Sequence, residues 1–185
     1  MDRVVIAGGV QSTSTSPRST RRTPGTDDWG DCMSPSHPAT PDAPAFDMTI
    51  TVGWNAAVEA GVTREEMDAW SLRSHQRAVA GIDTGAFAAE LVPVEVTDRD
   101  GTTHLFETDE HPRRSTTLEK LAALPPLHPE IEGFSITAGN SAGVNDGAAA
   151  MVLASEPVLV SEGLESLAVV RGWASAGVEP ARTGL

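Results

Sequence analysis

One stretch constrains the fold more than any other part of the sequence, and it covers residues 134–155, FSITAGNSAGVNDGAAAMVLAS. A short apolar segment opens it, a longer one closes it, and small residues between them indicate a turn. Its glycines permit positive φ angles and the close approach of a ligand or a second backbone, and its polar residues supply short-range hydrogen bonds. The pattern predicts either a ligand-binding turn between a buried strand and a second buried element, or a packing turn that binds nothing. The residues concerned are Gly139, Gly143, Gly147, Asn140, Ser141, Asn145 and Asp146.

Composition and charge limit the partners. The chain has 185 residues and a formal net charge of −13, which argues against a nucleic acid or an anionic membrane surface because both bind basic faces. Cys32 is the only cysteine, so an internal disulfide and a cysteine-rich metal site are excluded and a reducing compartment is indicated. The apolar run that follows Met1 is too short for a signal peptide or a membrane span, and we expect a cytoplasmic protein.

The first 45 residues change character abruptly. Residues 3–10 have the continuous β-branched character of a strand covered on both faces. Residues 12–24 are almost entirely Ser, Thr, Pro and Arg, which predicts a mobile surface loop. The prolines that follow, at positions 35 to 44, oppose a regular helix or a central strand.

Helical patterns begin in the middle of the chain. Residues 51–61 predict a helix closed by Gly61. Thr63 and Glu66 form a capping box that begins a second helix, which we expect to end at Gly85.

A predicted hairpin and three further elements follow. Residues 91–96 and 102–108 predict two strands around a turn at 98–101. A capping pattern of Ser115/Thr116 before Glu119 predicts a short helix over 118–124. Near the end, Glu156-Pro157 suits the start of a short helix that continues over 158–164 and ends around Gly163, and we expect a final strand over 167–173.

Several residues are candidates for chemistry. Residues 139–143 match G-x-S-x-G, the serine nucleophile motif of hydrolases, but those enzymes place their histidine after the serine and the last histidine here, His128, precedes Ser141. The five histidines are scattered and lack metal-ligand spacing, so no metal site is predicted. Cys32 lies among acidic residues that disfavour a thiolate, which indicates an incidental thiol. Arg113 and Arg114 could contact a phosphate or form a solvated basic pair.

Four blocks of the sequence together resemble the thiolases, the acetyl-CoA C-acyltransferases. The most specific is TAGNSAGVNDGAAA at 137–150, and the blocks occur in the family's order. The other three are VIAGGVQS at 5–12, TREEMDAWSLRSHQRA at 63–78, and DEHPR at 109–113 followed by TLEKL at 117–121.

The resemblance implies an α/β fold that is part of the thiolase fold. It assigns residues 1–12 to a strand and turn of the N-terminal half, 13–45 to a low-complexity loop, and 46–133 to a loop domain that covers coenzyme A. Residues 134–165 would return to the N-terminal half, and 166–185 would start the C-terminal half. Family members form dimers or tetramers.

The resemblance also implies a chemistry and a set of contacts. Thiolases transfer an acyl group between a 3-ketoacyl-CoA and CoA, in fatty acid or steroid side-chain metabolism, with a nucleophilic cysteine, a histidine and a second cysteine. None of these three maps onto this chain, so an internal fragment without a catalytic residue or a metal is expected. The alternatives are a non-enzymatic acyl-CoA-binding or interaction module and, more remotely, the serine hydrolase. The residues expected to contact CoA are Arg113, Ala138, Gly139, Ser141 and Ala142.

Overall fold

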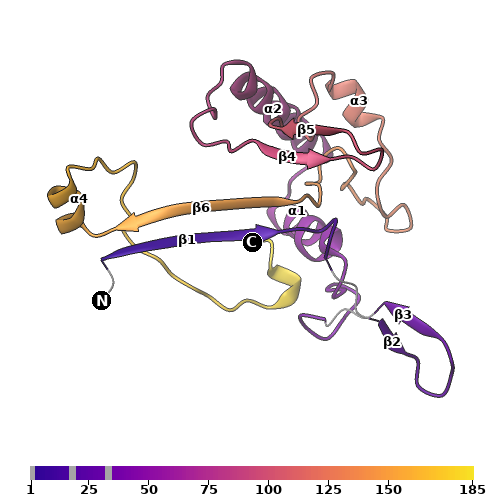
Figure 1. Cartoon of the computed structure of the whole chain (residues 1–185). Helices are drawn as coiled ribbons and strands as arrows, with labels where there is room; N and C mark the ends of the chain where they lie inside the picture. Colours follow the sequence, from indigo (N-terminus) through magenta and orange to yellow (C-terminus); the bar gives the residue numbers. More distant parts are fainter. Residues whose placement is uncertain (1–2, 17–19, 32–34) are drawn as a thin grey trace. The chain divides into compact units, whose positions relative to one another are not determined.

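The computed structural model describes residues 3–16, 20–31 and 35–185. It divides into two compact units, each described here by itself (Figure 1). The first unit comprises Met1–Ser36 and Val144–Val178, and the second comprises His37–Gly143 and Glu179–Leu185. The stretch 134–155 is therefore divided between the units after Gly143.

The first unit is built on a two-stranded antiparallel sheet. Strand β1, Val4–Gln11, pairs with β6, Gly147–Ala154, in a continuous register (Figure 1). The strand predicted at 3–10 is confirmed, but its predicted burial is wrong: the exposed fraction of Ile6 is 77%. The reason is that, within the described residues, this sheet has two strands only, and a strand is buried on both faces only where other layers cover it.

A short hairpin replaces part of the predicted mobile loop. Strand β2, Thr20–Arg22, pairs with β3, Trp29–Asp31. Arg22 holds the turn by donating from Nε to the carbonyl of Thr26 at 2.6 Å and by pairing with Asp27. A local ion pair thus orders residues that their composition alone assigns to a loop. Cys32 lies outside the described residues, so the prediction of an incidental thiol is not tested.

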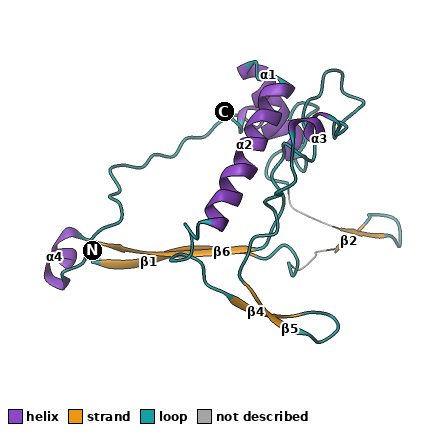
Figure 2. Cartoon of the chain, turned by 90° about the horizontal axis from the view of Figure 1, so that it is seen from above, coloured by secondary structure: helices purple, strands orange, loops and turns teal. Residues whose placement is uncertain are grey.

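The C-terminal part of the first unit differs from prediction. Helix α4, Glu156–Glu162, begins at the predicted Glu156-Pro157 and ends at Gly163 with φ 63°, so the predicted helix, its start and its glycine stop are confirmed. The strand predicted at 167–173 is wrong, since the structure has loop there (Figure 2). Trp173 is 89% exposed. A strand needs a neighbouring strand for its backbone hydrogen bonds, and this segment has none among the described residues.

The second unit begins with three helical segments. A π-helical turn, η1, Thr49–Trp54, continues into α1, Asn55–Ala60, and the chain then reverses at Gly61 with φ 66°. Helix α2, Arg64–Asp83, begins at the predicted capping box: Thr63 Oγ1 accepts from the Glu66 amide at 3.2 Å, and Glu66 Oε2 accepts from the Thr63 amide at 2.9 Å. Both predicted helices are confirmed. No helix in the described part of the chain is both long and apolar enough to span a membrane.

The predicted hairpin and short helix are also present. Strands β4, Val94–Thr97, and β5, Thr103–Phe106, are shorter than predicted and pair around a turn in which Gly101 has φ 87°. Helix α3, Leu118–Ala122, is capped by Thr117, whose hydroxyl accepts from the Lys120 amide at 3.3 Å. The predicted cap at Ser115/Thr116 is wrong by one position. A capping oxygen accepts from the backbone N–H three residues further on, and for Lys120 that residue is Thr117.

The core of the second unit gathers around the segment 134–137. Phe134 lies against Trp54 and His128, with ring centroids 5.1 and 4.9 Å away. The segment is buried, as predicted, but it is not the predicted strand: it makes one isolated bridge, between Pro126 and Thr137. The short helix η2, Pro180–Arg182, contacts the rest of this unit through Asn55, whose side-chain Nδ2 donates to the Ala181 carbonyl at 2.9 Å. The buried apolar residues are Ala43, Ala57, Leu121, Phe134 and Ile136.

Candidate functional site

The turn at 138–142 packs directly on helix α3. A β-carbon on Gly139 would lie 2.5 Å from Leu124 Cδ1 and 2.7 Å from Leu121 Cδ2, so these leucines occupy the space that a side chain would need. None of Gly139, Gly143 and Gly147 has a positive φ angle, so of the two properties of glycine named above the turn uses only close approach, at Gly139. The glycine at 139 permits close packing against another element, not an unusual backbone conformation.

The side chain of Asn140 closes the turn through hydrogen bonds to the backbone. Its Oδ1 accepts from the Thr137 amide at 2.7 Å, and its Nδ2 donates to the Ser135 carbonyl at 3.0 Å and to Asp68 Oδ1 at 3.1 Å. Thr137 Oγ1 accepts from the Gly139 amide at 3.2 Å. The backbone of the turn is therefore fixed by side-chain acceptors on both of these amides.

Helix α2 supplies two charged residues to this network. Asp68 is only 3% exposed, and its Oδ2 accepts from Arg64 Nε at 2.8 Å. Arg64 also donates to the carbonyls of Leu121 and Leu124, at 2.7 and 3.1 Å. The sequence analysis missed both residues. Their spacing of four positions on a helix is a signal that could have found the pair, although it does not reveal the burial.

The residues predicted to contact CoA all lie in the second unit. Ala138 and Ala142 are exposed, whereas Gly139 and Ser141 are half-buried. The turn packs against α3 through Gly139, and Arg113 lies in the segment that leads into α3. No hydrogen bond joins Ser141 to a histidine within the described residues, so nothing in this geometry supports the serine hydrolase.

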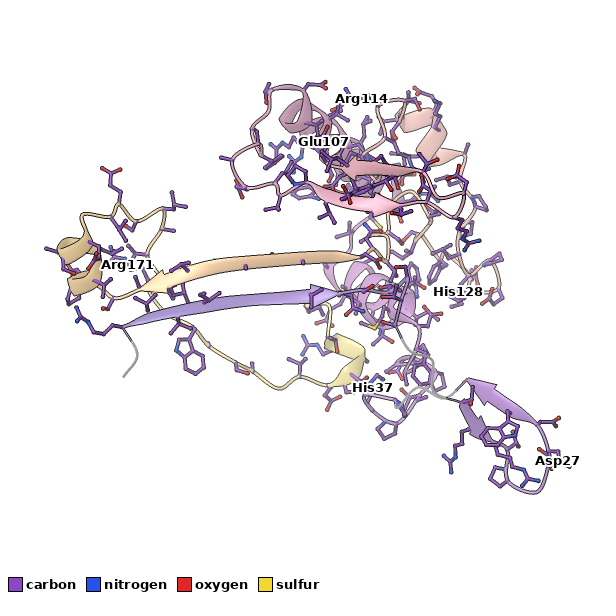
Figure 3. The ribbon with its side chains drawn as sticks, in the orientation of Figure 1. Asp27, His37, Glu107, Arg114, His128 and Arg171 are labelled. Atoms are coloured by element: carbon purple, nitrogen blue, oxygen red, sulfur yellow. The ribbon has the colours of Figure 1, made fainter. Side chains whose placement is uncertain are left out.

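Arg113 and Arg114, adjacent in sequence, have different environments. Arg114 makes two hydrogen bonds to the carboxylate of Asp83, at 2.7 and 2.6 Å, and these lower the pKa of Asp83 (Figure 3). Arg113 is exposed, and its guanidinium forms no ion pair with any residue that the structure describes. Its backbone amide donates to His75 Nδ1 at 3.2 Å. Of the two, Arg113 is the one whose charge is available to an anion.

The surroundings of His75 disfavour its protonated form. Burial lowers its pKa, and the positive charges of His111 and Arg113 lower it further. A neutral imidazole is required here because Nδ1 accepts the Arg113 amide, and a protonated nitrogen could not accept.

His128 has the opposite environment. Its Nδ1 lies 2.8 Å from Glu130 Oε1 and its Nε2 lies 2.8 Å from Asp47 Oδ2 (Figure 3). The hydrogen bond to Glu130 raises the pKa of His128, and the charge of Asp47 raises it further although partial burial opposes the shift. The two carboxylates lie at opposite nitrogens of the ring. Within the described residues, no group of three or more His, Cys, Asp or Glu side chains is arranged to hold a metal ion.

Two cavities open on this unit. The larger, of about 500 Å³, is lined by the end of α2, residues 85–91 and residues 107–112, away from the turn. The smaller, of about 390 Å³, borders Asn140 and is walled by Met67 and Trp70 of α2. The turn therefore borders this cavity at Asn140 and packs against Leu121 of α3 at Gly139.

Comparison with known proteins places this arrangement in a family. The model of the thiolase N-terminal domain matches residues 2–157. The chain is 51% identical to the beta-ketoadipyl-CoA thiolase of Pseudomonas aeruginosa over 71% of its own length and 32% of that protein's. It is 39% identical to an acetyl-CoA acetyltransferase of Chromobacterium violaceum over 98% of its length and 47% of that protein's.

Solved structures agree with the sequence comparisons. The acetyl-CoA acetyltransferase of Bacillus anthracis superposes with a TM-score of 0.74 at 32% identity, over 97% of this chain and 45% of that one. The human mitochondrial 3-ketoacyl-CoA thiolase superposes with a TM-score of 0.68 at 32% identity, over 88% of this chain and 41% of that one. The chain thus spans about a third to a half of the length of these relatives. It has part of the α/β thiolase fold, and it belongs to the thiolase family.

Proposed function

We propose that this chain binds the coenzyme A portion of an acyl-CoA, in the acyl transfer between a 3-ketoacyl-CoA and CoA that the thiolase family carries out. One observation carries the proposal. Of two adjacent arginines, Arg114 is tied to Asp83, whereas Arg113 presents an exposed guanidinium beside α3. A guanidinium fork suits a phosphate oxygen, and CoA carries several phosphates.

The turn at 138–142 would contact the pantetheine arm. Support comes from its accessibility at Ala138 and Ala142 and from the fixed backbone between Thr137 and Gly139. A rigid turn of small residues lets a narrow, extended ligand lie close to the backbone at little entropic cost.

We further propose that the chain does not complete the reaction by itself. The chemistry expected of the family uses two cysteines and a histidine, and this sequence has one cysteine, Cys32, in a segment that matches none of the family's catalytic blocks. The cytoplasmic location, the assembly into oligomers, and the link to fatty acid or steroid side-chain metabolism stay predictions, as does the lack of a nucleic-acid or membrane partner.

Thermal unfolding with and without CoA tests the binding part of the proposal. A ligand that binds only the folded state raises Tm with concentration, so increasing CoA should raise Tm while the same concentration of sulfate should not. An unchanged Tm at millimolar CoA would contradict the proposal.

An acetoacetyl-CoA cleavage assay tests the second part. The purified chain should show no CoA-dependent cleavage. Robust turnover that Cys32→Ala abolishes would overturn the proposal that these residues alone are inactive.

A further inference from the structure

We infer that Arg64 and Asp68, on α2, are positioning residues for CoA binding, because a partly buried hydrogen-bond relay through them joins the turn predicted to contact CoA to the end of α3, the helix that follows the Arg113 segment. The inference rests on the proposed function for its role in binding. The relay runs from Arg64 to Asp68 and from Asp68 to Asn140, and neither charged residue is among those expected to touch CoA.

Asp68 helps to determine the orientation of the side-chain amide of Asn140. The Nδ2 side of the amide faces Asp68 and the Ser135 carbonyl, both of which accept hydrogen bonds. The Oδ1 side faces the Thr137 amide, which only donates. Only one of the two amide orientations satisfies all three partners, because the flipped amide would place an oxygen against a carboxylate and an NH₂ against an N–H. The carboxylate therefore directs the carbonyl oxygen of Asn140 toward Thr137, which closes the turn over Ala138 and Gly139.

Arg64 carries the same relay to α3. Its terminal nitrogen donates to the carbonyls of Leu121 and Leu124, the same leucines whose methyl groups lie against Gly139. The planar guanidinium is suited to this role because it can reach a carboxylate and two backbone carbonyls at once, which a lysine ammonium on its flexible stem does not do in the same geometry.

The relay links the turn to α3, the helix that follows the Arg113 segment. Arg113 lies in the segment that leads into α3, and the turn at 138–142 packs on the C-terminal end of that helix. A relay that fixes the end of α3 and the turn together sets the position of the turn relative to the Arg113 segment. Loss of one hydrogen bond in a buried, connected network displaces its neighbours as well.

The test compares Asp68→Asn with the matched control Glu65→Gln, which removes a carboxylate from the exposed first turn of the same helix. An asparagine at 68 keeps the size of the side chain but removes the charged acceptor that Asn140 Nδ2 and Arg64 Nε share. We expect hydrogen exchange at the Thr137 and Gly139 amides to accelerate about tenfold or more, as loss of a buried charged acceptor allows, while amides of the β4–β5 ladder keep their rates. The dissociation constant for CoA should rise by a similar factor, and Glu65→Gln should change neither quantity.

Wild-type exchange rates at Thr137 and Gly139 in folded Asp68→Asn protein would overturn the inference. If Asp68→Asn does not fold, Arg64→Lys provides the same comparison and should show the same two changes. The exchange rates are measured without CoA. A wild-type chain that fails to bind CoA would therefore contradict the proposed function, while the exchange rates would still test whether Asp68 fixes the turn. Unaltered CoA affinity with accelerated exchange would overturn the positioning role.

Discussion

A β-carbon on Gly139 would lie 2.5 Å from Leu124 Cδ1, just past the end of α3, so a larger residue at 139 requires that leucine to move. The φ angle of Gly139 is not positive, and the requirement is therefore one of packing alone.

Gly139→Ala should destabilise the protein. The added methyl group forces Leu121 and Leu124 to move, and overpacking of this kind costs about 1–3 kcal/mol. Urea unfolding measures the change in the free energy of unfolding. Gly147→Ala is the control, since a β-carbon there meets no atom within 4 Å. Equal stability of the two variants would show that the leucines adapt without cost.

The fold should lose stability as pH rises past the pKa of His128. This pKa is raised by the hydrogen bond to Glu130 and by the charge of Asp47, so the protonated form is favoured in the folded state. The stabilisation is complete below about pH 6.5, the value in the unfolded chain, and is lost as pH rises through the raised pKa. Urea unfolding between pH 6 and 9 should show this decrease, and His128→Gln should reduce it. An identical pH dependence in the variant would exclude His128 as the cause.

His75 should produce the opposite dependence. Its pKa is lowered chiefly by burial, and its neutral form accepts the Arg113 amide. Its contribution is complete above about pH 6.5 and is lost as pH falls through the lowered pKa. His75→Asn supplies an acceptor that does not titrate, so its free energy of unfolding should decrease less than that of the wild type between pH 7 and 5. A steeper decrease in the variant would contradict this assignment.

The sequence predicted best those elements whose signals are local. The capping box at Thr63 and the helix-ending glycines at 61 and 163 act within one turn of chain, and the structure has all three. These signals depend on a few neighbouring residues, which the sequence displays directly.

Features that depend on distant partners were predicted less well. The segment 167–173 has the composition of a strand, but it pairs with no strand in the part of the chain that the structure describes. On α2, the apolar Trp70 is 67% exposed whereas the charged Asp68 is buried. Asp68 is buried because Arg64 and Asn140 satisfy its carboxylate, and Asn140 is 72 positions away in sequence. Nothing local in the sequence indicates that partnership.

Calorimetric titration of the purified chain with CoA, for the wild type, Arg113→Ala and Arg114→Ala, tests the central claim most directly. The account predicts a dissociation constant on the order of micromolar for the wild type and a weakening of about tenfold or more for Arg113→Ala, since a charged hydrogen bond to phosphate is lost. Arg114→Ala should bind nearly as the wild type does, because that guanidinium is engaged by Asp83. No saturable binding by the wild type, or equal affinity in Arg113→Ala, would contradict the claim that this chain binds CoA through Arg113.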